Sequence, residues 1–183
     1  MADEVVLSRF GKLPTKDHGT ALFVGIKGIG KHRLAQTINE CNTEFPLQIR
    51  TATALPLPND HQNLRPRIDY VTFFIDLENK LSFDVVKLSV KSLAVDYFLG
   101  RCCFILTNAK KEECNNVDIQ DVIEFANVYD SPIICADLKS KDGQRCLAQK
   151  LLQRIKPACG YHGDVTPLLL DTTRQIFGVD DSM

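Results

Sequence analysis

The sequence predicts an α/β fold in which a mostly parallel central sheet lies between two layers of helices. Apolar runs typical of buried strands alternate four or five times with segments of helical spacing. The clearest run, Ile68–Leu77, is almost continuously apolar, as a strand covered on both faces should be. No repeat, linker or low-complexity tract interrupts the chain. We therefore expect one three-layer domain over residues 1–183, with a polar lead-in at 1–18 and a tail at 178–183.

The individual elements follow from short patterns. "TALFVGI" (20–26) reads as a buried strand that ends in glycine, and the next residues carry apolar side chains at helical spacing. Three prolines predict a loop over 55–67, because proline lacks the N–H that a strand donates. In chain order, the expected strands are 20–26, 45–53, 68–77, 101–107 and 132–136, and the expected helices are 31–41, 81–95, 117–129, 143–155 and 168–177.

Two of the expected helices carry more detailed predictions. In the helix at 117–129, the residues expected to face inward are Ile119, Val122, Ile123 and Ala126. The helix at 143–155 is expected to stop before Pro157, since proline removes a helical hydrogen bond.

Composition and charge exclude several classes of protein. The net charge of -1 gives no overall field that attracts nucleic acid or an anionic membrane. No apolar stretch approaches the roughly 20 residues of a transmembrane helix, and the first residues lack a signal-peptide pattern. Seven cysteines, several of them in predicted strands, indicate reduced thiols in the cytosol or nucleus. Cys102 and Cys103 are expected to pack as small core residues on opposite faces of a strand.

The segment "VGIKGIGKH" (24–32) comes close to a phosphate-binding loop. Gly25, Gly30 and Lys31 satisfy the pattern G-x-x-x-x-G-K between a predicted strand and a predicted helix. Backbone N–H groups of such a loop converge on an anion. His32, however, replaces the Ser or Thr whose hydroxyl would bind Mg²⁺. Gly25, Gly30 and the intervening Gly28 also have a structural interpretation, because they permit a tight strand-to-helix turn.

The other landmarks of a small GTPase occur in order, but each is altered. No glycine lies between Lys31 and Ile68, so an Asp-x-x-Gly motif is absent from that stretch. Asn108 follows the strand at 101–107, yet lysine replaces the carboxylate that would bind guanine. Asp137 stands after the last strand, where a lysine is expected. We therefore predict a small-GTPase-like, P-loop-type topology without functional switch regions, and no catalysis, cofactor or metal site.

Several segments resemble the centromere protein M family, small-GTPase-like pseudo-enzymes of the inner kinetochore. The matching stretches extend from about residue 20 to about residue 170 and are "LPLP" (55–58), "RPRID" (65–69), "FFIDL" (73–77), "YFLGRCCFILT" (97–107), "YDSPIICADL" (129–138) and "LAQKLLQRI" (147–155).

The resemblance implies a nuclear, non-catalytic subunit of the kinetochore that acts in mitotic chromosome segregation during cell division. It implies centromere protein I as the direct partner, with centromere proteins H and K, in the constitutive centromere-associated network. It implies no bound GTP, no membrane and no sequence-specific nucleic-acid contact. This sequence departs from the family in keeping Gly25, Gly30 and Lys31. A divergent nucleotide-binding switch built on 25–31 therefore stays open as the alternative.

Surplus apolar residues suggest where a partner binds. The expected helix at 81–95 carries two apolar stripes, Leu81, Val85, Leu88 and Val95 on one side and Phe83, Val86, Val90, Leu93 and Ala94 on the other. Deep burial explains both stripes, or one faces a partner. Tyr97, Phe98 and Leu99 occupy a turn where polar residues are expected, and Leu168 begins a run of three leucines. We take these four residues as the candidate interface, with core packing as the alternative.

The remaining candidates carry little chemistry. Asp69 and Asp76 are seven residues apart in one predicted strand, so they face opposite sides and cannot act together as acid and base. Cys159 and His162 make only two ligands, too few for a metal site. Four basic residues flank loops and are interpreted as solvated: Arg65, Arg67, Lys110 and Lys111.

Overall fold

The computed structural model describes residues 7–8, 18–42, 44–58, 66–109 and 116–161. Within them, five parallel strands form one sheet in the order β2-β1-β3-β4-β5. The predicted strands are confirmed to within a few residues, as β1 (Gly19–Val24), β2 (Leu47–Ala52), β3 (Tyr70–Asp76), β4 (Cys102–Thr107) and β5 (Ile133–Ala136). The helices are α1 (Lys31–Cys41), α2 (Lys80–Lys91), α3 (Ile119–Val128) and α4 (Lys141–Ala158), with a 3-10 turn, η2 (Val95–Phe98).

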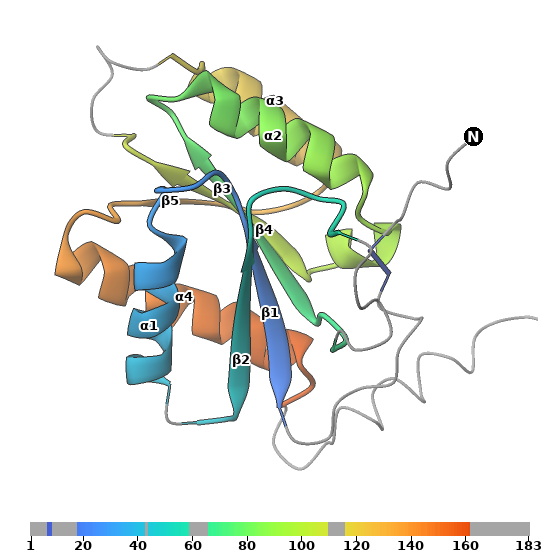
Figure 1. The fold of residues 1–183 in the computed structure, drawn as a ribbon, viewed down its shortest axis with the longest axis vertical. Coiled ribbons are helices and arrows are strands. Elements are labelled where there is room, and N and C mark those ends of the chain that lie inside the picture. Colours follow the sequence, from blue (N-terminus) through green and yellow to red (C-terminus); the bar gives the residue numbers. More distant parts are fainter. Residues whose placement is uncertain (1–6, 9–17, 43, 59–65, 110–115, 162–183) are drawn as a thin grey trace, which may run out of the picture.

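Helices cover both faces of the sheet, which confirms the three-layer α/β prediction (Figure 1). α2 and α3 pack on one face, where Phe83 of α2 and Val122 of α3 join inward residues of β1, β3 and β4. α1 and α4 pack on the other face through Leu34, Ile38 and Leu151, among others. Successive strand residues therefore alternate between two cores. Cys102 belongs to the first and Cys103 to the second, as predicted.

The connections place one edge of the sheet where ligands bind in folds of this kind. From β1 the chain crosses to β2 on one side, and β3 then returns to the other side of β1. The strand order thus reverses at β1, and the loops after β1 and β3 lie at the same end because the strands are parallel. The glycine-rich loop after β1 stands at this switch point. Only the tertiary pairing reveals this, because the sequence gives no strand order.

α2 is shorter than predicted, and the lead-in explains why. Leu7 forms a parallel bridge with Leu93, donating its N–H to the Ser92 carbonyl and accepting from the Ala94 N–H. These backbone groups are therefore unavailable to a helix, and α2 ends at Lys91 instead of continuing to residue 95. The lead-in is consequently more than a polar tail, since Leu7 also packs against the core beneath α2.

Two further helix predictions are wrong in detail. α4 continues through Pro157 to Ala158, because the Cys159 N–H reaches the Ile155 carbonyl and carries the ladder past the missing donor. In α3, Ile123 is 37% exposed. The inward position belongs instead to Phe125, whose ring packs edge-on against Phe83 and Phe104. The predicted helix at 168–177 lies outside the described residues. None of the helices in the described ranges has the length and apolar character to cross a bilayer.

Candidate functional site

A cleft of about 740 Å³ opens at the carboxyl ends of the strands. The glycine loop and the start of α1 form one wall, and the ends of β3 and β4 form another. Of the five residues singled out in the predicted phosphate loop, Gly28, Gly30, Lys31 and His32 line the cleft, and Gly25 does not. The structure therefore brings these residues together at one site, at the switch point of the sheet.

The glycines of this loop are required by its shape. Gly28 and Gly30 have φ angles of 82° and 97°, in the left-handed region that other residues disfavour. Gly25 lies so close to β3 that an added Cβ would stand 2.9 Å from the Cβ of Phe74 and 3.1 Å from its carbonyl oxygen. The turn and its packing therefore account for all three glycines without a ligand.

Lys31 is buried, although the phosphate-loop pattern would have it reach towards a ligand. Its Nζ donates hydrogen bonds to the carbonyl oxygens of Gly25, at 2.5 Å, and Ile26, at 2.8 Å. Only 4% of the residue is exposed, and burial lowers the pKa of the ammonium group. His32, at the position of the missing metal ligand, is exposed to solvent. The lysine is thus engaged by its own loop, and the next side chain points away from the core.

Asp76 is a site residue whose role the sequence reasoning missed. β3 is the third strand, so Asp76-Leu77-Glu78-Asn79 occupies the place of Asp-x-x-Gly, after Ile68 and not before it. Asp76 lines the cleft, and its carboxylate accepts from Asn108 Nδ2 at 2.7 Å and from the Glu78 N–H at 3.1 Å. Asn79 stands where the motif has glycine and caps α2 by accepting from the Leu81 N–H.

The cleft carries charges of both signs, and Lys31, Asn108 and Asp76 are bonded within the protein. Its cationic residues are Lys27, Lys31, Arg33 and Lys139, and its acidic residues are Asp76 and Glu78. Asn108, the predicted remnant of a base-reading motif, has φ 61° and binds Asp76 through its side chain. Across the described ranges, no cluster of three or more His, Cys, Asp or Glu side chains could hold a metal ion.

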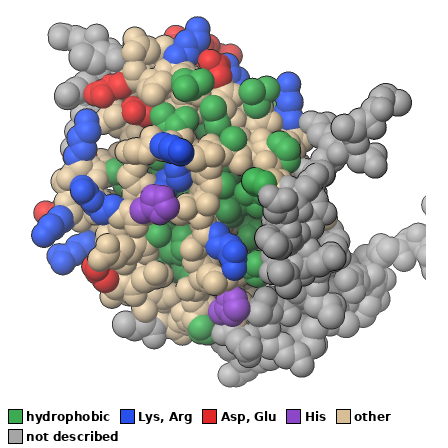
Figure 2. All heavy atoms as spheres, viewed as in Figure 1, with side chains coloured by type: hydrophobic (Ala, Val, Ile, Leu, Met, Phe, Trp, Pro, Cys, Tyr) green, Lys and Arg blue, Asp and Glu red, His purple; other side chains and the backbone are tan. Residues whose placement is uncertain are grey.

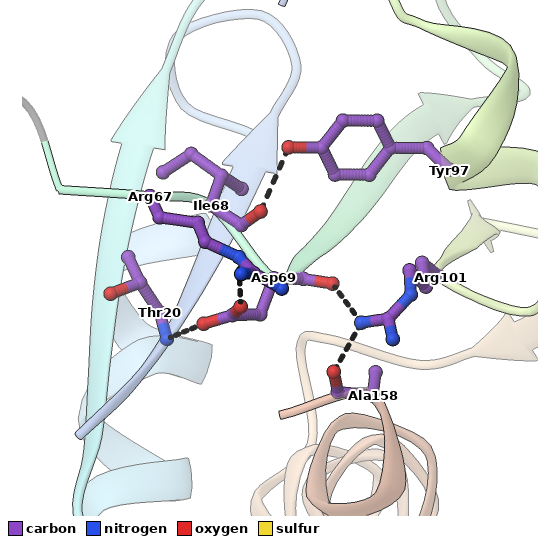
Figure 3. A network of polar contacts seen from close by, with 7 residues as sticks. All are labelled: Thr20, Arg67, Ile68, Asp69, Tyr97, Arg101 and Ala158. Carbon is purple, nitrogen blue, oxygen red and sulfur yellow. Dashed lines mark hydrogen bonds and ion pairs between the residues drawn. The ribbon is translucent and has the colours of Figure 1, made fainter. Parts of the chain in front are cut away.

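A second polar cluster lies at the opposite end of the sheet, near the amino ends of the strands (Figure 3). The buried Asp69 carboxylate accepts from the Thr20 N–H at 3.0 Å and forms an ion pair with Arg67 Nε at 3.2 Å. Arg101 Nη1 donates to the carbonyl oxygens of Asp69 and Ala158, which ties the end of α4 to the sheet. Asp69 and Asp76 therefore lie at opposite ends of β3 and share no site.

This cluster corrects the interpretation of Arg67 as a solvated loop residue. Arg67 is 7% exposed and structural, because a buried guanidinium requires a carboxylate partner. The other three basic candidates, Arg65, Lys110 and Lys111, lie outside the described residues, as does His162. Cys159 packs against Gly19, and burial raises its pKa, as expected of a core thiol.

The two stripes of α2 differ in burial. Phe83, Val86 and Val90 lie in the core, whereas Leu81 and Leu88 are 61% and 64% exposed. Deep burial of both stripes is therefore wrong. Hydrophobic side chains gather in Figure 2 over the part of the molecule where α2 runs in Figure 1. We call Leu81 and Leu88, with the half-buried Val85 between them, the α2 stripe.

The turn after α2 divides the interface candidates. Tyr97 is fully buried, and its hydroxyl donates to the Ile68 carbonyl at 2.8 Å, so its expected place on the surface is wrong. Phe98 is half-buried against the ring of Tyr129, and the centroids of the two rings lie 4.9 Å apart. Leu99 is 79% exposed and lies at the surface. Leu168 lies outside the described residues.

Comparison with known proteins gives consistent matches along the chain. The family model described as Centromere protein M (CENP-M) matches residues 4–177. A protein of Xenopus laevis named Centromere protein M is 33% identical over 161 residues, covering 88% of this chain and 89% of that protein. The protein of that name from Homo sapiens is 30% identical over 165 residues, covering 90% of this chain and 91% of that protein. The one from Danio rerio is 30% identical over 155 residues, covering 85% of this chain and 83% of that protein.

Proposed function

Because the chain belongs to the centromere protein M family, we propose that it is a non-catalytic structural subunit of the inner kinetochore. It acts at the centromere of nuclear chromosomes, where the complex it joins supports chromosome segregation. Its direct partner is centromere protein I, and centromere proteins H and K complete the immediate assembly within the constitutive centromere-associated network.

One observation carries this proposal: α2 has a second apolar stripe that nothing in the described chain covers. Leu81 and Leu88 are each more than 60% exposed on a helix whose other stripe already anchors it to the sheet. A surface helix needs one such stripe for folding, so the other is available for a protein partner. Val95 and Leu99, 77% and 79% exposed, extend the apolar surface beyond the end of α2.

The cleft supports a non-catalytic role. A GTPase cycle needs a metal ion to neutralise the developing phosphoryl charge, and the exposed His32 is a poor ligand for Mg²⁺. Lys31 is held by the carbonyls of Gly25 and Ile26, and Asn108 is held by Asp76. The glycine loop is then a retained scaffold element that joins β1 to α1, and the domain functions by docking.

Reconstitution of the complex tests the proposal. We expect the full chain to co-elute with centromere proteins I, H and K, and Leu99→Glu to weaken its capture by protein I at least tenfold while the fold is retained. Leu168→Glu tests the leucine run in the same way. Gln149→Glu is the matched control, because it adds the same charge to an exposed position of α4 on the other face of the sheet. Full capture of both folded leucine variants would refute this interface.

The alternative, a divergent nucleotide-binding switch, is favoured by one observation. Lys31 and Asp76 both line one cleft of about 740 Å³. A titration of the full chain with fluorescent GTP and ATP analogues, with and without Mg²⁺, separates the two functions. The scaffold predicts no saturable binding, whereas the switch predicts saturable binding that Lys31→Ala removes.

A further inference from the structure

β5 forms an open edge of the sheet in the described structure. It pairs with β4 on one side, and the strand order ends there. The Phe104 N–H donates to the Pro132 carbonyl at 2.9 Å, and Phe104 is in register with Ile133. Backbone groups alternate in direction along a strand, so Ile134 bonds towards β4 while the N–H and C=O groups of Ile133 and Cys135 point away from it. No described strand pairs with that outer side.

A groove of about 570 Å³ runs beside this edge. One wall consists of Ile133, Ile134 and Cys135 of β5, and the other of Lys150, Gln153 and Arg154 of α4. A groove between a strand edge and a helix suits an extended peptide, which pairs its main chain with the strand while its side chains contact the helix. Cys135 is exposed and small, and leaves the edge accessible.

The charge of the groove is of one sign. Lys150 and Arg154 lie one helical turn apart on α4, are exposed, and form no ion pair among the described residues. Among the described residues, no carboxylate lines the groove. On the other face of the sheet, the segment from the N-cap of α3 to the residue after its C-cap carries no lysine or arginine, but it has four acidic residues, Asp118, Asp121, Glu124 and Asp130. The attraction for an anionic ligand is therefore confined to the α4 side of the β5 edge.

We propose that this groove binds an extended acidic peptide segment of a partner protein, which adds to β5 as a sixth strand. The peptide main chain pairs with Ile133 and Cys135, and its carboxylates face Lys150 and Arg154. The pairing of a main chain with a strand edge favours a peptide over nucleic acid, which has no alternating N–H and C=O groups. The α2 stripe lies on the other face of the sheet, so this site is independent of the docking surface proposed above.

The test uses the full chain and a blocked eight-residue peptide that alternates valine and glutamate, measured by fluorescence anisotropy. We expect saturable binding, amide shift changes centred on Ile133–Ala136, and at least tenfold weaker affinity for Lys150→Glu combined with Arg154→Glu. The matched control is Lys141→Glu combined with Arg145→Glu, which changes the net charge equally on the same helix away from the groove. This control is expected to weaken binding less than threefold.

Main-chain pairing is tested separately. Methylating alternate peptide nitrogens removes the donors that face β5 and is expected to abolish binding, as is Cys135→Pro, with Cys135→Ser as its folded control. Equal binding of the methylated peptide, or of a lysine-for-glutamate peptide, would overturn the proposal. The absence of any binding would also overturn it, and Lys150 and Arg154 would then serve to prevent other strands from pairing with the open edge. Binding of duplex DNA that both double variants weaken equally would indicate a general anion-binding surface instead.

Discussion

The Nζ atom of Lys31 lies 2.5 Å from the carbonyl oxygen of Gly25, six residues earlier in the chain. The lysine that a phosphate loop directs at a nucleotide here closes the loop on itself. A second bond to Ile26 completes the arrangement, and 4% exposure leaves the ammonium group little contact with water. The residue therefore acts as a crosslink between the end of β1 and the start of α1.

This crosslink predicts a stability effect for Lys31→Ala. Loss of the two charge-assisted hydrogen bonds is expected to lower the free energy of unfolding by about 1.5–3 kcal/mol, measured by urea denaturation. The neighbouring exposed His32→Ala is the control and is expected to change it by less than about 0.5 kcal/mol. A variant as stable as the parent would show that the lysine does not hold the loop.

Tyr97 and Leu99 lie two residues apart and are expected to respond in opposite ways. Tyr97→Ala removes a fully buried ring and its bond to Ile68, and should lower the free energy of unfolding by about 3–5 kcal/mol. Leu99→Glu alters a side chain that is 79% exposed, and it should change the free energy of unfolding by no more than about 0.5 kcal/mol. Thermal and urea denaturation measure both. A strongly destabilised Leu99→Glu would assign this leucine to the core.

The α2 stripe makes a prediction for the isolated domain. Leu81→Glu combined with Leu88→Glu should preserve the circular dichroism spectrum and reduce self-association at high concentration, because two exposed apolar side chains are removed. Val86→Glu is the contrasting variant on the buried stripe and should unfold the domain, since it buries an unpaired carboxylate. Analytical ultracentrifugation is the measurement. Self-association that is unchanged in the folded double variant would contradict the role of the stripe.

The Asp69 cluster should be the most sensitive polar feature of the fold. Asp69→Asn leaves the Arg67 guanidinium buried without its carboxylate and is expected to lower the free energy of unfolding by about 3–5 kcal/mol. A double-mutant cycle with Arg67→Met should recover part of that loss. Asp84→Asn removes the exposed ion pair with Lys87 and should change the free energy by no more than about 1 kcal/mol. Equal effects at the two sites would contradict this reading.

Buried thiols predict a loss of stability at alkaline pH. Burial raises the pKa of Cys102 and of Cys103 above the ordinary value of 9.0. Above that pH the unfolded chain loses thiol protons that the folded chain keeps, so the free energy of unfolding falls as pH rises, by about 1.4 kcal/mol per pH unit for each thiol.

Urea titrations between pH 7 and 10.5 measure the slope. The double variant Cys102→Ala and Cys103→Ala should have the shallower slope above pH 9, whatever its stability at neutral pH. Lys31 acts in the opposite direction, because its pKa is lowered by burial and its contribution grows as pH rises towards 10.5. Because this one lysine opposes several buried thiols, the free energy of unfolding is still expected to fall as pH rises. Parallel slopes for parent and double variant would contradict the assignment.

The fold was predictable because its signals are local. Near-continuous apolar runs with β-branched residues indicate strands buried on both faces, and β3 and β4 are buried along almost their whole length. The alternation of such runs with helical patterns then leaves a parallel sheet with helices on both faces. The stripes of α2 were also visible, because helical periodicity separates Phe83 from Leu88 on the wheel.

The site was predicted only in part. The glycine loop is contiguous in sequence, so Gly28, Gly30 and Lys31 were found. Asp76 was missed because the Asp-x-x-Gly motif was sought only before Ile68, and because Asn79 replaces the glycine that would signal it after 68–77. The engagement of Asn108 by Asp76 joins residues 32 apart, and no local pattern signals it. Tyr97 was placed on the surface because its sequence neighbours are turn residues, while its ring fits between distant elements.

The sequence by itself determined the class of fold, the glycine turn and the absence of a hydroxyl next to Lys31, because each depends on residues close together in the chain. Tertiary structure decided which α2 stripe is covered, where α2 ends and which edge of the sheet is open. These depend on contacts between residues tens of positions apart, such as Leu7 with Leu93 and Asp69 with Thr20. Burial and hydrogen bonding are properties of the packed whole, so only the assembled sheet and its helices fix them.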